Sequence, residues 1–230
     1  AGGSNTCTLA SMGRVRGLAH RFVIESGGCV VASRAVVENA QRSFVANAGC
    51  GDAADAAACL RSKTAEEIAR ALPETVAVAG GSADYWEPHV DGAWLAASPD
   101  VEIAAGDGVD APVVLGANAR ETSRTVAPIQ TCEAYEAAIE AQFHSMAARI
   151  LVAYPCEDYE SPRRALEAVT TEARFVCGSR RNGRAFARGK TTPTWRYLFD
   201  KGLTRGPAAG FGAFHGLEVL YVFGNGMGSA

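Results

Sequence analysis

The sequence predicts an α/β fold built on a mainly parallel sheet. Residues 111–116 form a continuous apolar run between turn signals, which is typical of a strand buried on both faces of a parallel sheet. Residues 21–26 and 194–199 are short runs with strand composition, and we expect each to form a further strand. Long stretches of helical composition separate the three runs, and this alternation indicates an α/β sheet.

The first part of the chain carries three helix signals. Residues 3–18 mix small and apolar side chains and suit a helix. In residues 31–48 the apolar side chains recur at helical spacing, and Gly49 is a plausible stop. Thr64 and Glu67 have the spacing of a capping box, in which each side chain satisfies a backbone amide of the other residue, so we expect a helix to begin there.

The later part of the chain is predicted to be largely helical between its strands. Residues 131–153 and 161–189 are long and alanine-rich, with no proline after Pro162. Between the two parts, residues 89–95 contain the Asp-Gly pair of a tight turn and are predicted to form a hairpin. Because no repeat or clear linker is visible, we expect residues 1–230 to form a single domain.

Composition excludes several classes of protein. The chain has 230 residues, enough for a substantial core, and a formal net charge of −3, which gives no reason to expect a nucleic-acid partner. No apolar run approaches the length of a membrane span. Nothing in the sequence indicates the oligomeric state.

Seven cysteines are a high and odd number for one chain. Cys50 and Cys59 are the most suggestive pair, because their spacing is too long for a short zinc knuckle and no histidine neighbours them. A short disulfide loop between two helices fits them better. Two unpaired buried thiols are the alternative, since free cysteine packs as a small hydrophobe. The sequence does not pair the other five, Cys7, Cys29, Cys132, Cys156 and Cys177.

His215 has the surroundings expected of a catalytic base. Glycine follows it directly, and an acidic residue and an aromatic-rich apolar stretch come next. Histidine is the side chain best suited to move protons near neutral pH, and the flanking glycines allow a tight turn that holds the imidazole at a cleft. A lone histidine is more often a core or surface side chain, which is what we expect of the others, His20, His89 and His144.

Glu121 follows the predicted buried strand of residues 111–116. In open α/β sheets the functional residues gather at the carboxyl ends of the strands. For any single glutamate a solvated loop carboxylate is the commoner role. Position alone therefore leaves both roles open for Glu121.

Three segments resemble those of the type-B carboxylesterases, the family of cholinesterases, carboxylesterases and some fungal lipases. Residues 212–225 are similar to the segment that carries the family's catalytic histidine, and residues 116–121 match its Gly-x-Asn-x-x-Glu segment. Ala1-Gly2-Gly3 is similar to the tail of the nucleophile motif Gly-x-Ser-Ala-Gly-Gly. The resemblance implies a partial α/β-hydrolase fold, made of the later strands of the mainly parallel sheet with flanking helices.

The resemblance also implies a catalytic triad in the order serine, acid, histidine. Glu121 would be the acid and His215 the base. The serine nucleophile would stand immediately before Ala1, whose backbone amide would be one donor of the oxyanion hole. Ser26 and Glu218 would support the pair without reacting themselves.

The implied activity is hydrolysis of a small-molecule carboxylic ester, with no cofactor and no metal. Because the family's N-terminal half and C-terminal helical segment have no counterpart in residues 1–230, we expect this stretch to be inactive alone, although its parent is active. A non-catalytic cholinesterase-like binding or adhesion module is one rival function, and another serine hydrolase, such as a lactonase or an amidase, is a second.

The run around Cys50 and Cys59 also resembles the disulfide loop of the lipases in this family, which implies that the two cysteines are bonded. Such a bond would indicate an oxidising compartment. We therefore expect a secreted or periplasmic protein.

Overall fold

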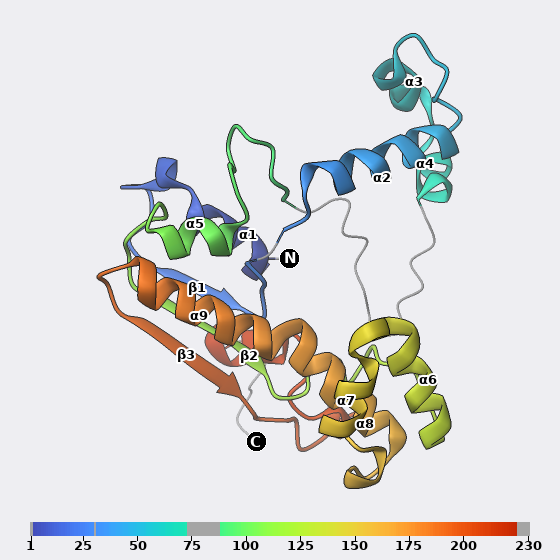
Figure 1. The fold of residues 1–230 in the computed structure, drawn as a ribbon, viewed down its shortest axis with the longest axis vertical. Coiled ribbons are helices and arrows are strands. Elements are labelled where there is room, and N and C mark those ends of the chain that lie inside the picture. The colour runs from blue at the N-terminus through green and yellow to red at the C-terminus, as the bar shows by residue number, and fades with distance from the viewer. Residues whose placement is uncertain (1, 30, 73–87, 225–230) are drawn as a thin grey trace. The chain divides into compact units, whose positions relative to one another are not determined.

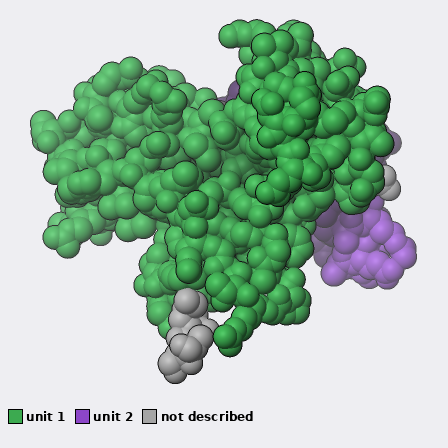
Figure 2. Space-filling model, turned by 90° about the horizontal axis from the view of Figure 1, so that it is seen from below, with its two compact units in different colours: residues 1–30, 78–80, 99–230 green, residues 31–77, 81–98 purple. Residues whose placement is uncertain are grey.

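A computed structural model describes residues 2–29, 31–72 and 88–224. The chain divides into two compact units, which Figure 2 colours green and purple. Unit 1 comprises residues 1–30, 78–80 and 99–230, and unit 2 comprises residues 31–77 and 81–98. The single domain expected from the sequence stays a prediction.

Unit 1 is built on a three-stranded parallel sheet with the strand order β1-β2-β3 (Figure 1). In register, Ile24 of β1 lies beside Leu115 of β2, which lies beside Arg196 of β3. The central strand is the apolar run, and its side chains are buried along almost its whole length. The three predicted strands are thus confirmed, with the bounds Phe22–Glu25 for β1, Val113–Asn118 for β2 and Thr194–Phe199 for β3.

Two helices pack against this sheet, and a third packs against both of them. Helix α1 contacts β1, α9 contacts β2 and β3, and α5 lies between α1 and α9. Figure 1 shows α9 running along the two later strands. Their side chains form the first core, which includes Ile24, Ile103, Val113, Leu115 and Phe186. The bounds of the helices are Gly2–Ser11 for α1, Pro99–Ala105 for α5 and Cys177–Gly189 for α9.

A second core lies among three further helices of unit 1 and includes Tyr135, Ile139, Leu166 and Val169. No helix in the described ranges is long and apolar enough to span a bilayer. The helices around this core are α6 (Cys132–Phe143), α7 (Ala147–Ala153) and α8 (Pro162–Thr171). The short α10 (Leu217–Val222) follows His215 in the chain.

Two predicted helices are shorter or more interrupted than expected. The first ends at Ser11 and is followed by a separate 3₁₀ turn, Gly13–Val15. The helix predicted over residues 131–153 breaks at His144, whose φ of +45° is left-handed, so α6 and α7 are separate helices. A helix cannot continue through such a backbone conformation. The residues around His144 are ordinary for a helix, so the sequence does not predict the break.

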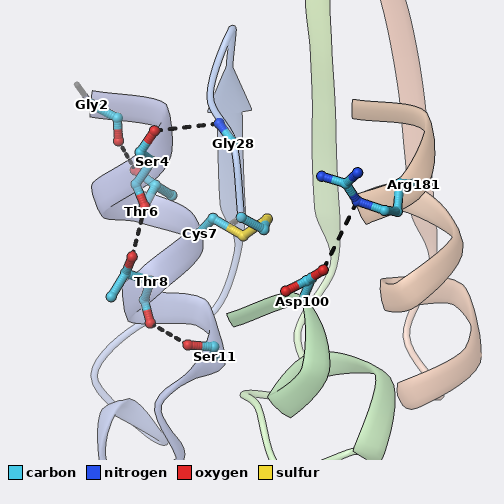
Figure 3. The surroundings of a disulfide bond; sticks show 10 residues. Gly2, Ser4, Thr6, Cys7, Thr8, Ser11, Gly28, Asp100 and Arg181 are labelled. Atoms are coloured by element: carbon cyan, nitrogen blue, oxygen red, sulfur yellow. Dashed lines mark hydrogen bonds and ion pairs between the residues drawn. A yellow bond between two sulfur atoms is a disulfide. The ribbon is translucent and has the colours of Figure 1, made fainter. Parts of the chain in front are cut away.

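Two disulfides hold elements of unit 1 together. Cys7 of α1 is bonded to Cys29, beyond the end of β1, with Cα atoms 5.4 Å apart (Figure 3). Beside this bond, the Gly28 amide donates to the Ser4 hydroxyl oxygen at 3.3 Å. Cys132, at the start of α6, is bonded to Cys156, with Cα atoms 5.7 Å apart. Cys177 is exposed and carries a free thiol.

Unit 2 consists of short helices around a small core. The Cys50–Cys59 disulfide, with Cα atoms 5.8 Å apart, joins the end of α2 to α3 and confirms the predicted bond. The capping box of Thr64 and Glu67 opens α4, also as predicted. The bounds are Arg34–Asn47 for α2, Ala56–Ser62 for α3 and Ala65–Ala71 for α4.

The hairpin predicted over residues 89–95 is wrong, since none of residues 88–98 belongs to a named strand. The Asp91 carboxylate instead accepts the backbone amides of Ala93, Trp94 and Leu95 at 2.8–2.9 Å. These bonds lower the pKa of Asp91 to about 2. A side chain that satisfies the amides of its own turn removes the need for a partner strand.

The Cys50–Cys59 bond closes a short loop in a unit with few buried side chains. Replacing both cysteines by serine is expected to lower the free energy of unfolding of unit 2 by about 2–3 kcal/mol, because the unfolded chain gains loop entropy. Hydrogen exchange at the amides of α2 and α3 measures this directly. Cys177→Ser, which removes an exposed free thiol, is the matched control. Equal protection in the double variant and the wild type would contradict the expectation.

Candidate active site

Glu121 stands just beyond the carboxyl end of the central strand β2. Its loop is joined by backbone hydrogen bonds to the end of β3 and to the segment that carries His215. These bonds run from the Ala119 amide to the Phe199 carbonyl (2.8 Å), from Arg120 to Ala213 (3.1 Å) and from His215 to Glu121 (3.2 Å).

The Glu121 carboxylate is completely buried and is contacted by three donors. Its Oε2 lies 2.6 Å from Nδ1 of His215. Its Oε1 accepts the backbone amide of Asn118 at 2.7 Å and the hydroxyl of Ser26 at 2.5 Å. Because both oxygens are occupied away from water, the carboxylate is held in one orientation, facing the imidazole. The structure therefore brings together the two residues that the sequence singles out.

The His215 imidazole has one protected and one accessible side. Its side chain is 51% exposed, although Nδ1 faces the buried carboxylate. A carboxylate at this distance accepts a hydrogen bond, so we infer that Nδ1 carries the proton and that Nε2 keeps its lone pair. An imidazole in this tautomer can take a proton from a neighbouring hydroxyl, which is the work of a general base.

Electrostatics favour the protonated form of His215. The hydrogen bond with Glu121 raises its pKa above the ordinary value for histidine, and partial burial opposes this rise. When His215 takes up a proton, the buried carboxylate of Glu121 is therefore already in place to stabilise the imidazolium.

Ser26 directly follows β1 in a left-handed conformation, with φ at +50°. Its amide donates to the carbonyl of Gly116 at 3.0 Å, which ties the turn to β2. Residues other than glycine rarely adopt this conformation, and such strained positions gather at functional sites. Here it directs the hydroxyl to Glu121, and Oε1 of the buried Glu218 lies 3.4 Å from the same hydroxyl.

Asn118 belongs to this network, although the sequence did not single it out. Its buried side chain donates to the Phe214 carbonyl at 2.7 Å and to Oε2 of Glu218. Its backbone amide donates to Glu121. Asn118 thus joins the loop of the acid to the segment of the histidine. The fixed asparagine of the Gly-x-Asn-x-x-Glu pattern was the signal that could have found it.

Phe175 also contacts the site without a signal in the sequence. Its ring centroid lies 5.2 Å from that of His215, with the two rings tilted by 42°. It lies on a π-helical turn, Glu172–Val176, between α8 and α9. Such turns are rare in proteins overall, but those that occur are often found at functional sites. This one places an apolar ring beside the imidazole.

Ala1 lies outside the described residues, so its place in an oxyanion hole stays a prediction. The Ser26 hydroxyl contacts Glu121 and Glu218, and the supporting role of Ser26 and Glu218 also stays a prediction. Within the described part of the chain, no group of three or more His, Cys, Asp or Glu side chains is placed to hold a metal ion.

Comparison with known proteins places the chain in a family. The sequence model of the carboxylesterase family matches residues 1–230. The chain belongs to the carboxylesterase family. A search of the curated proteins gives no significant match.

Solved esterases share the fold of this carboxylesterase-family chain. EstA of Aspergillus niger matches with a TM-score of 0.78 at 21% identity, over 97% of this chain and 46% of EstA. Two structures of PNB esterase match with TM-scores of 0.73 and 0.74 at 22% identity, over 97% of this chain and 45% and 47% of theirs. The chain thus spans about half the length of these structures, and the predicted partial α/β-hydrolase fold is confirmed.

Proposed function

We propose that the protein hydrolyses carboxylic esters by acyl transfer through a serine, with His215 as the base and Glu121 as the acid. The observation that carries this proposal is the 2.6 Å contact between a buried carboxylate and an imidazole whose other side is accessible. A serine hydroxyl placed at Nε2 would lose its proton to His215 as it attacks the ester carbonyl, and His215 would return a proton to the leaving alcohol.

The proposed nucleophile is a serine immediately before Ala1, at the start of α1. Packing within the described residues supports this position. A β-carbon at Gly3 would lie 2.5 Å from the Glu25 carbonyl oxygen and 2.7 Å from Cα of Gly27, so α1 begins directly against the turn that carries Ser26. The Ser26 hydroxyl in turn donates to the triad acid. The start of the helix and the Glu121–His215 pair thus share one edge of the sheet.

Ser26 itself is proposed as a supporting residue and not as the nucleophile. Its side chain is buried, and its hydroxyl donates to the carboxylates of Glu121 and Glu218 and not to His215. A nucleophilic serine needs a base that removes its proton. Ser26 instead supplies a proton to the hydrogen bond that holds Glu121 in place.

The substrate class we propose is a small-molecule ester, and the location is extracellular or periplasmic. The three disulfides are compatible with an oxidising compartment, where such bonds persist.

The full-length protein is expected to turn over short p-nitrophenyl esters, with a lower kcat/KM for matched lactones and anilides. A polypeptide limited to residues 1–230 is expected to be inert, because the proposed nucleophile is not part of it. A full-length protein that binds esters without turnover would favour a binding module instead. Faster turnover of a lactone or an amide than of the matched ester would favour one of the other serine hydrolases.

A further inference from the structure

Arg120 immediately precedes the proposed acid, and its side chain reaches a different element from that of Glu121. Nε and Nη2 of Arg120 donate to the two carboxylate oxygens of Glu167, at 2.6 and 3.0 Å. Glu167 lies on α8, with only 1% of its side chain exposed. This paired geometry is the strongest form of an arginine–carboxylate contact and fixes the orientation of both groups.

Helix α8 holds the acid loop on both sides of Glu121. Ahead of the acid, Arg120 binds the carboxylate of Glu167. Behind it, the Thr122 hydroxyl contacts the Glu167 carbonyl at 3.2 Å and the hydroxyl of Thr170 at 2.7 Å. A further arginine of α8, Arg164, also pairs with Glu167, so that the buried charge is compensated from two directions.

Arg120 also contacts the segment that leads to His215. Its backbone amide donates to the Ala213 carbonyl at 3.1 Å, and its Nη1 donates to the Gly210 carbonyl at 3.5 Å. Gly212 has φ at +62°, and a β-carbon there would clash with Cδ of Arg120. The guanidinium stem thus passes directly over the glycine, and a larger residue there would be strained at this φ and would displace the Arg120 side chain.

We propose that Arg120 is a positioning residue that holds the loop of Glu121 and the segment of His215 in register, through its paired contact with Glu167. This role rests on the function proposed above. The 2.6 Å distance between Nδ1 of His215 and Oε2 of Glu121 depends on how their two segments are placed, because the residues are 94 positions apart in sequence. Arg120 is the side chain that binds one of these segments to α8 and packs on the other.

The Arg120–Glu167 contact could serve only the stability of the fold, or it could position the Glu121–His215 pair, and these two roles predict different results. If the cluster only stabilises the fold, its loss lowers the melting temperature and leaves the folded enzyme's kinetics unchanged. If Arg120 sets the geometry of the pair, its loss weakens the Glu121–His215 hydrogen bond. The pKa of His215, which that bond raises, then falls toward its ordinary value.

Arg120→Lys in the full-length protein tests this difference, because lysine keeps the charge for Glu167 and loses the planar fork. We expect kcat for a p-nitrophenyl ester to fall on the order of tenfold or more with KM unchanged, since small misplacements of catalytic groups are costly. The acid limb of the pH profile of kcat/KM should move to lower pH. Glu167→Gln should give the same two changes. Arg70→Lys, in the exposed pair with Glu66, is the matched control.

Wild-type kcat and pH profile in a folded Arg120→Lys protein would overturn the role of Arg120. They would leave the proposed function standing, provided that His215→Ala still abolishes turnover. Turnover that survives His215→Ala would overturn both. If Arg120→Lys and Glu167→Gln both fail to fold, the cluster serves stability, and the positioning role is likewise overturned.

Discussion

His215→Ala in the full-length protein is expected to lower kcat for a p-nitrophenyl ester by roughly 10⁴- to 10⁶-fold, the range seen when a triad base is removed. The reason is geometric. Among the described residues, His215 is the only base whose side chain the buried Glu121 carboxylate orients, and its other side is accessible. Without it the nucleophile keeps its proton and the leaving alcohol receives none. KM should change little, because the imidazole acts on the reacting atoms and contributes little to ground-state binding.

His20→Ala is the matched control for this measurement, since His20 is exposed and precedes β1, at the opposite end of that strand from Ser26. It should leave kcat unchanged. Near wild-type turnover in a folded His215→Ala protein would contradict the assignment of the base. Circular dichroism and melting temperature show whether the variant is folded.

Glu121→Gln is expected to lower kcat on the order of 10⁴-fold, the effect of the equivalent change in other serine hydrolases. An amide cannot satisfy all three of the donors that now face the carboxylate. If its oxygen faces His215, its NH₂ group meets the Asn118 backbone amide, which is itself a donor and loses its acceptor. If its NH₂ group faces His215, the imidazole proton must move to Nε2, and the base is lost.

The same variant should change the pH dependence. In the wild type the Glu121 hydrogen bond raises the pKa of His215, so that the active, neutral imidazole appears only at higher pH. The acid limb of kcat/KM should therefore shift to lower pH in Glu121→Gln. For folding the sign is the reverse of a carboxylate's. The raised pKa stabilises the native state below the unfolded pKa, and this contribution disappears as the pH rises through the folded-state pKa.

Glu66→Gln removes an exposed carboxylate on α4 and is the control for the loss of one negative charge. It should leave both kcat and the position of the acid limb unchanged. An acid limb that stays in place in Glu121→Gln would show that Glu121 does not set the pKa of His215.

The strands and the proximity of Glu121 to His215 could be predicted from sequence because their signals are local. The apolar run of β2 requires burial on both faces, and the resemblance of residues 116–121 to the Gly-x-Asn-x-x-Glu segment of the carboxylesterases pointed to Glu121 as the proposed acid. Cys50 and Cys59, nine residues apart, could be paired for the same reason.

Features that depend on contacts between distant segments could not be predicted from the sequence. Cys7 and Cys29 can be paired only once α1 is packed on β1, and the contact between Arg120 and Glu167 joins residues 47 positions apart. The hairpin failed for a different reason. An Asp-Gly pair fits both a hairpin turn and a loop. Here the Asp91 side chain stabilises the loop, because it accepts hydrogen bonds from three backbone amides.

The most direct measurement of the proposed function is peptide mapping of the full-length protein after reaction with a serine-directed alkyl phosphonate. Such reagents form a stable adduct only with a serine that a base activates. We expect one adduct, on a serine immediately before Ala1, and none in the His215→Ala protein. An adduct on Ser26 would show that the residue assigned here to hold Glu121 is the nucleophile. The absence of any adduct on a folded, ester-binding protein would contradict catalysis by this site.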